Sequence, residues 1–366
     1  MTFLWGKLIR PLMFRLDAEP AHELGMKGLR SGLAAPFYAD ARSFGIGPVR
    51  RFGLEFPNPV GIAAGFDKNA VAVDQLASLG FGFVEVGTVT HRPQPGNPKP
   101  RMFRLGEDQA LINRLGFNNE GAEAVAARLV KLKPKCVLGI NIGKNKDVPI
   151  EDATENYLAA FKLLQPLADY IAINISSPNT PNLRELQRSD NLDELLGVLQ
   201  DANWEPSEGV AEASGRRHAK PLLVKIAPDL SEAETEAAVD MCRKHDISGI
   251  IATNTTIDRD GLRSPDVSKI GAGGLSGRPL EARSTAVISS IYKYSKGKLP
   301  IIGVGGVFDA QDAFNKIAAG ASLVQAYTGF IYKGPGFARE VNEGLARILA
   351  ERNFSCIEDA VGCAHK

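Results

Sequence analysis

The sequence lacks the features that mark metal-binding and disulfide-rich proteins. Its four cysteines, Cys136, Cys242, Cys356 and Cys363, form no C-x-x-C pair, and none has a short spacing to one of the five histidines. Zinc and iron–sulfur sites usually need such spacings. We therefore expect no metal, and we interpret the thiols as buried or incidental, with no need for an oxidising compartment.

Charge and hydropathy exclude further classes. The 43 basic and 42 acidic residues give a formal net charge of +1, without a long run of one sign, so no nucleic-acid partner is expected. No apolar run reaches the roughly 18 to 20 residues of a spanning helix, and the N-terminus lacks a secretory signal pattern. A chain of 366 residues can fill one large barrel with a small appendage, or two ordinary domains.

Short apolar segments alternate with helix-like stretches from Val60 onward, which is typical of a parallel α/β fold. The predicted strands are residues 60–65, 83–89, 136–143, 170–178, 221–228, 249–256, 300–307 and 323–330. Eight strands favour a closed barrel over an open sheet. Ser231 with Glu234 forms a capping-box pair, and Asp309 precedes an amphipathic run that stops at Gly320, so the intervening helices can form an outer ring.

Three connections are unusually long or polar. Residues 90–117 and 257–280 follow strands, so both should lie on the catalytic face of a barrel. Residues 201–220 are polar and rich in small side chains, and we predict a surface loop there without a chemical role.

The first 45 residues differ in character from the rest. Residues 3–16 form a basic amphipathic segment that Pro11 should break, and a second helix-like piece starts near Pro20. Such a two-helix flap can place its apolar side in a bilayer interface. The alternative is that this apolar side packs on the barrel as ordinary core. These residues taken alone favour that alternative.

A barrel places its active site at the carboxyl ends of its strands, and here nearly every predicted strand ends in polar or glycine residues. In strand order these are Asp67 and Lys68; Thr88; Asn141 and Gly143; Asn174, Ser176, Ser177 and Asn179; Lys225; Thr253, Asn254, Thr255 and Thr256; Gly303, Gly305 and Gly306; and Tyr327, Thr328 and Gly329. The last two sets can direct backbone N–H groups at a phosphate. The alternative is that these glycines only close a tight barrel.

Amides and lysines gather at these strand ends. The asparagines are Asn174, Asn179 and Asn254, together with Asn113 in the long connection at 90–117. Their amides would be costly to bury unpaired, and a flat heterocycle with carbonyl and N–H groups would pair them. Lys68 and Lys225 indicate an anionic ligand, with surface ion pairs as the alternative.

Ser177 is the candidate for proton transfer, between Ser176 and Pro178 on the exit from strand four. A serine hydroxyl is a weak base at neutral pH, so it would pass its proton to a positioned relay. No G-x-S-x-G elbow surrounds it, which argues against hydrolase chemistry.

Four segments together resemble the dihydroorotate dehydrogenase family, in order and over nearly the whole chain. They are AAGFDKN at 63–69, NRLGFNN at 113–119, NISSPNT at 174–180 and GGLSGRPL at 273–280. The resemblance implies an α/β fold, a (β/α)8 TIM barrel at 46–366 behind a small N-terminal helical extension at 1–45. It also implies one noncovalent FMN and oxidation of (S)-dihydroorotate to orotate in pyrimidine biosynthesis.

The resemblance further implies a set of site residues. FMN would contact Ala64, Gly65, Lys68, Thr88, Asn141, Asn174, Lys225, Thr253, Gly277, Gly305, Gly306, Tyr327 and Thr328. Orotate would contact Lys68, Asn113, Arg114, Leu115, Gly116, Phe117, Asn174, Asn179, Asn254 and Thr255. Ser177 would remove the C5 proton, with Thr180 in the relay, while Lys225 would stabilise negative charge on the reduced flavin.

Serine at position 177 favours the quinone-using class of the family, because the soluble class carries cysteine as the base. In that class the N-terminal extension forms a quinone tunnel, so the resemblance makes membrane docking of residues 1–45 the preferred interpretation. His22 and Arg104 are expected at the quinone end, with surface or capping roles as the alternative. We expect a peripheral monomer on the cytoplasmic face of a bacterial inner membrane.

Other barrels fit less well. A sugar-phosphate isomerase or aldolase with a Schiff base on Lys225 would explain the phosphate turns but not four asparagines around a serine. Flavin barrels that reduce dihydropyrimidines usually use a cysteine acid, and those that reduce dihydrouridine need a basic RNA-binding face. A membrane-bound scaffold would leave the strand-end polar groups unused.

Overall fold

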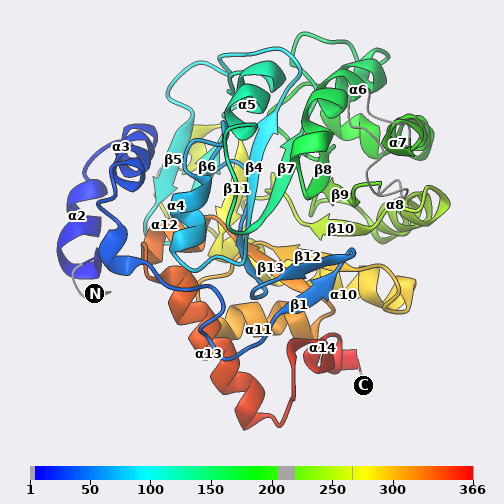
Figure 1. The fold of residues 1–366 in the computed structure, drawn as a ribbon. Helices are drawn as coiled ribbons and strands as arrows, with labels where there is room; N and C mark the ends of the chain where they lie inside the picture. Colours follow the sequence, from blue (N-terminus) through cyan, green and yellow to red (C-terminus); the bar gives the residue numbers. More distant parts are fainter. Residues whose placement is uncertain (1–4, 205–218, 266, 366) are drawn as a thin grey trace.

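The computed structural model describes residues 5–204, 219–265 and 267–365. Its centre is a closed parallel barrel with strand order β10-β12-β13-β3-β4-β7-β8-β9 (Figure 1). The strands are β3 (Val60–Ile62), β4 (Phe83–Val89), β7 (Val137–Ile142), β8 (Tyr170–Asn174), β9 (Leu222–Ile226), β10 (Gly249–Ala252), β12 (Ile301–Val304) and β13 (Leu323–Ala326). Each falls within one predicted strand, so the eight-stranded barrel is confirmed.

Every residue of these eight strands is buried. Parallel strands read as continuous apolar runs because crossover helices cover the outer face while side chains fill the interior. The covering helices are α4 (Val73–Ser78), α5 (Ala122–Leu129), α6 (Ala153–Leu164), α7 (Ser189–Trp204), α8 (Glu232–Lys244), α10 (Glu281–Ser295), α11 (Ala310–Ala318) and α13 (Phe337–Glu351). Shorter helices are η2 (Ala35–Phe37), η3 (Gln165–Leu167), η4 (Leu183–Gln187), α9 (Val267–Ile270), η5 (Arg278–Leu280), α12 (Thr328–Lys333), α14 (Ile357–Ala360) and η6 (Cys363–His365).

Two of the covering helices begin as predicted from local sequence. The hydroxyl of Ser231 accepts the backbone N–H of Glu234 at 3.3 Å, and the Glu234 carboxylate accepts the backbone N–H of Ser231 at 2.8 Å. Asp309 and Asp312 form the same reciprocal pair at the start of α11. Each pair satisfies backbone donors that a helix leaves free in its first turn, which fixes where α8 and α11 begin.

The two long connections contain strands that the sequence did not predict. β5 (Met102–Leu105), β6 (Ala110–Asn113) and β11 (Gly274–Gly277) form an antiparallel sheet in the order β11-β6-β5. A further hairpin, β1 (Val49–Arg51) with β2 (Leu54–Phe56), precedes the barrel. The predicted surface loop at 201–220 is wrong at its start, because α7 continues to Trp204, and residues 205–218 lie outside the described residues.

The N-terminal helices are η1 (Trp5–Ile9), α2 (Arg10–Met13) and α3 (Ala18–Arg30). Figure 1 shows them in blue at one side of the barrel, beside β5 and α12. The predicted break at Pro11 corresponds to the boundary between η1 and α2, because Pro11 lies in the first turn of α2, where proline is tolerated. The chain turns between α2 and α3.

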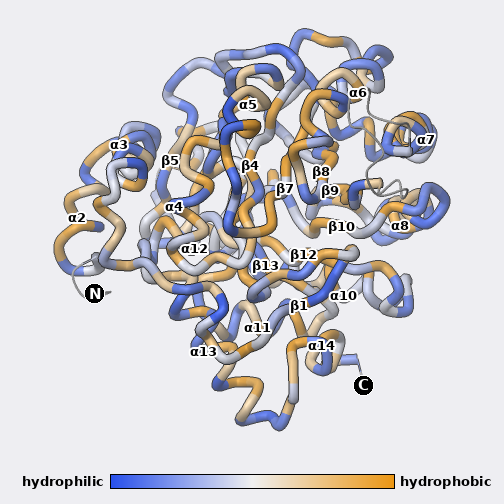
Figure 2. The backbone as a smooth tube through the Cα atoms, viewed as in Figure 1, coloured by the Kyte–Doolittle hydropathy of each residue, from blue (hydrophilic) through white to orange (hydrophobic). Residues whose placement is uncertain are grey.

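Several large apolar side chains of this N-terminal segment are exposed. They are Leu8, Leu12, Leu16, Leu24 and Leu33. In Figure 2 the barrel strands are largely orange, and orange segments also occur on α2 at the edge of the molecule. Within the described parts of the chain, no helix has the length and apolar character needed to cross a bilayer.

Candidate active site

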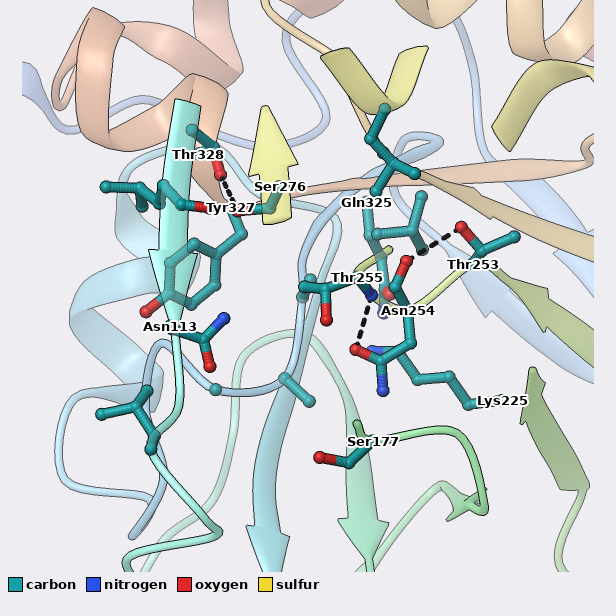
Figure 3. A pocket seen from close by; sticks show the side chains of 18 of the residues that line it. Asn113, Ser177, Lys225, Thr253, Asn254, Thr255, Ser276, Gln325, Tyr327 and Thr328 are labelled. Atoms are coloured by element: carbon teal, nitrogen blue, oxygen red, sulfur yellow. Dashed lines mark hydrogen bonds between the residues drawn. The ribbon is translucent and has the colours of Figure 1, made fainter. Parts of the chain in front are cut away.

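A pocket of about 1080 Å³ of empty space lies at the carboxyl ends of the barrel strands (Figure 3). The sheet β11-β6-β5 forms one wall, through Leu111, Asn113, Ser276 and Gly277. The expected residues that line the pocket are Ala64, Gly65, Lys68, Thr88, Asn113, Leu115, Gly116, Phe117, Asn174, Ser177, Asn179, Lys225, Thr253, Asn254, Thr255, Gly277, Gly305, Gly306, Tyr327 and Thr328. The structure therefore brings most of the expected site into one place.

Two of the residues expected to contact FMN or orotate do not line this pocket. Asn141 is fully buried beneath it, where its Oδ1 accepts hydrogen bonds from Thr88 Oγ1 at 2.5 Å and Asn174 Nδ2 at 3.2 Å. Arg114 points away: its guanidinium lies 4.6 Å over the Phe103 ring and donates to the carbonyl of Ala272 at 3.1 Å. The structure therefore does not support a substrate contact by the Arg114 side chain, because backbone carbonyls and an aromatic face elsewhere hold it.

Other residues line the pocket that were not expected from the sequence, notably Met102, Ser276 and Gln325. Gln325 stands on β13 two positions before Tyr327, so the alternation of side chains along a strand gave a signal for it. Ser276 belongs to the fourth family-like segment, and its Oγ lies 2.8 Å from Thr328 Oγ1. Met102 had no such signal, because β5 was not predicted.

The asparagines pair partly with each other. Asn179 Nδ2 donates to Asn113 Oδ1 at 3.2 Å, and Asn254 Nδ2 donates to Asn174 Oδ1 at 3.2 Å. Each amide offers two donors and an acceptor oxygen, so these contacts leave hydrogen-bonding capacity. Figure 3 shows Asn113, Asn254, Ser177 and Lys225 around one space, where that capacity can serve a ligand.

The two lysines differ in their surroundings. Lys225 Nζ lies 3.6 Å from Glu85 Oε1, so Lys225 forms a buried ion pair and not a surface one. Lys68 lines the pocket without a hydrogen bond or ion pair to any described residue. Burial lowers the pKa of Lys68 to about 8, although the Glu19 carboxylate opposes this effect. An unpaired ammonium in such a position favours an anionic ligand.

Ser177 is 5% exposed and its Oγ accepts the backbone N–H of Asn179 at 3.2 Å. That bond orients the hydroxyl without using its proton. Close in sequence, Thr180 Oγ1 is buried and has no hydrogen-bond partner among the described residues. A buried hydroxyl without a partner implies a missing donor or acceptor, such as a water or a ligand group.

The glycine turn after β12 suits a phosphate. Gly305 and Gly306 have φ angles of 122° and 73°, and a Cβ on Gly306 would lie 2.5 Å from the Cα of Glu281. Only glycine fits this turn, and successive backbone N–H groups in such turns bind anions. At the same pocket, Gln325 Oε1 is buried and unpaired among the described residues, as expected where a ring N–H donor binds. Both features fit a flavin mononucleotide.

A second, mostly apolar pocket lies against the N-terminal helices and shares Met102 and Leu111 with the first. Its empty space is about 1640 Å³, and both His22 and Arg104 line it. His22 is half-buried there, with its ring centroid 5.0 Å from that of Phe66, and burial and the charge of Lys68 lower the pKa of its imidazole to about 3. The Arg104 guanidinium donates to the Phe14 carbonyl at 2.8 Å, at the end of α2, so Arg104 also has a capping role.

Comparison with known proteins identifies the family. A family model described as dihydroorotate dehydrogenase matches residues 48–349. The chain belongs to the dihydroorotate dehydrogenase family. A relative from Gloeobacter violaceus named dihydroorotate dehydrogenase (quinone) is 50% identical over 98% of both chains. A Mycobacterium tuberculosis relative of the same name is 44% identical, again over 98% of both.

Solved structures of the same family also match this chain. Ligand-free DHODH from Eimeria tenella has a TM-score of 0.88 and 42% identity, covering 96% of this chain and 100% of that one. The same enzyme in complex with ferulenol has a TM-score of 0.87, covering 96% of both chains. The chain is thus a flavin-dependent oxidoreductase that converts dihydroorotate to orotate with a quinone as acceptor, as the four sequence segments implied. The isomerase, scaffold and other flavin-barrel alternatives are wrong.

Proposed function

We propose that the pocket at the strand ends binds one noncovalent FMN together with dihydroorotate, and that the apolar pocket admits the quinone. The observation that carries this proposal is the composition of one continuous pocket. One part holds four asparagine amides, Ser177 and Lys68, which has no ion-pair partner in the described part of the chain, and another part holds a glycine turn. These are the groups that a small anionic heterocycle and a phosphate require.

The proposed FMN contacts follow from these two parts of the pocket. Gly305, Gly306 and Thr328 would hold the phosphate, and the ring system would lie over Thr88 and Lys225. Ala64, Gly65, Lys68, Asn174, Thr253, Gly277 and Tyr327 would complete the contacts, with Asn141 acting from below. When bound, FMN supplies the acceptor for the hydride of dihydroorotate and passes the electrons on.

The proposed substrate residues provide charge, orientation and proton transfer. Lys68 would meet the carboxylate of dihydroorotate, and Asn113, Asn179 and Asn254 would pair with its ring amides, together with Asn174 and Thr255. The backbone of residues 115–117 would close the site. Ser177 would then take the C5 proton and pass it toward Thr180, whose buried oxygen has no hydrogen-bond partner among the described residues. Ser177 is nearly inaccessible to solvent, which limits competing water at that step.

The quinone and the membrane would be served by residues 1–45 as a flap on the catalytic domain at 46–366. The exposed leucines of this segment would enter the bilayer interface, and His22 and Arg104 would offer polar groups at the inner end of the apolar pocket. We propose that the protein acts as a monomer. We place it on the cytoplasmic face of a bacterial inner membrane.

A substitution in the apolar pocket can test whether that pocket serves only the reaction with the quinone. Gly25 lines that pocket, and a Cβ added there would meet no atom within 4 Å. Gly25→Phe should obstruct the pocket, with Gly25→Ala as the matched control. The rate of flavin reduction by dihydroorotate should stay unchanged while reoxidation by a quinone slows. Equal slowing of both half-reactions, or of neither, would contradict the assignment. Chromatography of the released flavin separately tests FMN against FAD and riboflavin.

A further inference from the structure

Glu85, on β4, is a carboxylate buried in the barrel interior below the pocket. Its side chain is 0% exposed, and it accepts hydrogen bonds from Asn141 Nδ2 at 2.9 Å, Tyr170 OH at 3.0 Å and Gln325 Nε2 at 2.7 Å. Lys225 Nζ lies 3.6 Å from its Oε1. A carboxylate so far from water is costly unless it is paired and hydrogen-bonded. The surrounding groups provide both an ion-pair partner and hydrogen-bond donors for Glu85.

These partners connect Glu85 to the pocket floor. Lys225 and Gln325 line the pocket themselves, and Figure 3 shows both side chains there. Asn141 extends the connection to Thr88, whose Oγ1 donates to Asn141 Oδ1 at 2.5 Å. The chemistry proposed for the site does not use Glu85, although Glu85 contacts two side chains that line the pocket, Lys225 and Gln325.

Glu85 also determines which end of the Gln325 amide faces the pocket. The Nε2 of Gln325 is fixed by the Glu85 carboxylate, which leaves Oε1 buried and unpaired among the described residues. Burial and the Glu85 charge raise the pKa of the Tyr170 phenol well above its usual value, so Tyr170 stays a donor to Glu85. The network therefore has one arrangement of donors and acceptors.

We propose that Glu85 is a positioning residue that sets the reduction potential of the flavin. This inference rests on the proposed function, since it requires the flavin in this pocket. Glu85 neutralises Lys225 as one half of a buried ion pair, and it presents the Gln325 carbonyl as an acceptor. Because charges interact strongly in a poorly solvated interior, loss of the Glu85 charge would leave the ammonium of Lys225 uncompensated. Uncompensated positive charge stabilises the electron-rich reduced cofactor more than the oxidised one.

The test is the midpoint potential of the purified holoenzyme. Glu85→Gln should favour the reduced cofactor by at least tenfold, which corresponds to about 30 mV for a two-electron couple. Glu232→Gln, the same change at an exposed position of α8, is the matched control and should leave the potential unchanged. A Glu85→Gln potential equal to that of wild type, or more negative, would overturn the proposal, because a merely structural role lowers thermal stability without this directed shift.

A second variant keeps the proposal testable if Glu85→Gln fails to fold or to retain flavin. Tyr170→Phe removes one hydrogen-bond donor from the Glu85 carboxylate and leaves its charge less stabilised. The field of that charge at the pocket should increase, so the potential should become more negative, opposite in sign to the first variant. An unchanged or more positive potential would overturn the proposal. If wild type holds no flavin that dihydroorotate bleaches, the proposed function itself fails, which is a distinguishable outcome.

Discussion

The protonation of Lys68 should control the affinity for orotate. Burial lowers the pKa of Lys68 from 10.5 to about 8, which corresponds to a cost of about 3 kcal/mol for the charged form. An anion that binds the ammonium recovers this cost and raises the pKa. If orotate binds at Lys68 as proposed, it should bind the protonated form, and its affinity should fall as pH rises through 8, by about tenfold between pH 7 and 9.

Replacing Lys68 makes the prediction specific. Lys68→Met removes a hydrogen bond to a charged group, which is worth about 1.5–3 kcal/mol, so orotate should bind roughly 10- to 150-fold more weakly and with no dependence on pH in this range. Lys298→Met, at an exposed position, is the matched control. The measurement is the flavin absorbance change during orotate titration at pH 7, 8 and 9. A constant wild-type affinity, or the same pH dependence in Lys68→Met, would refute the reasoning.

Three further predictions concern proton transfer, stability and membrane binding. Ser177→Ala should slow anaerobic flavin reduction by dihydroorotate by about 10²- to 10⁴-fold while orotate affinity stays within a few-fold in titrations; an unchanged rate would exclude Ser177 as the base. Burial lowers the pKa of Lys316 to about 7, so the unfolded chain binds more protons above that pH and stability should rise from pH 7 toward 10. Between pH 7 and 10, the melting temperature of Lys316→Met should rise less than that of wild type. Equal rises in the two proteins would contradict this. Leu8→Glu with Leu12→Glu should abolish sedimentation with anionic liposomes but preserve dihydroorotate oxidation by a soluble acceptor, whereas retained sedimentation would exclude this face.

The barrel could be predicted because its determinants are local or periodic. The eight strands read as apolar runs since each is buried on both faces, and the Ser231 and Asp309 caps depend on residues three positions apart. The sheet β11-β6-β5 could not be predicted in this way, because it pairs Asn113 with Gly274, far apart in the chain. β11 also begins and ends in glycine, which carries little strand signal.

The types of residue that gather at the pocket could be predicted from the sequence. How deep each side chain lies and which way it points could not. Strand ends identified the asparagines and lysines, because a barrel gathers them at one face. Only the structure shows that Asn141 lies below the pocket and that the Arg114 side chain leaves it. Glu85 could not be predicted because it stands between Val84 and Val86 inside β4, and its partners come from four other strands.

The most direct test of the central claim is an anaerobic titration of the purified protein, following flavin absorbance as dihydroorotate and then a soluble quinone are added. We predict that dihydroorotate bleaches the flavin, that orotate forms in equal amount, and that quinone restores the absorbance. A flavin that dihydroorotate leaves oxidised, in protein that still binds orotate, would contradict the assignment of the pocket.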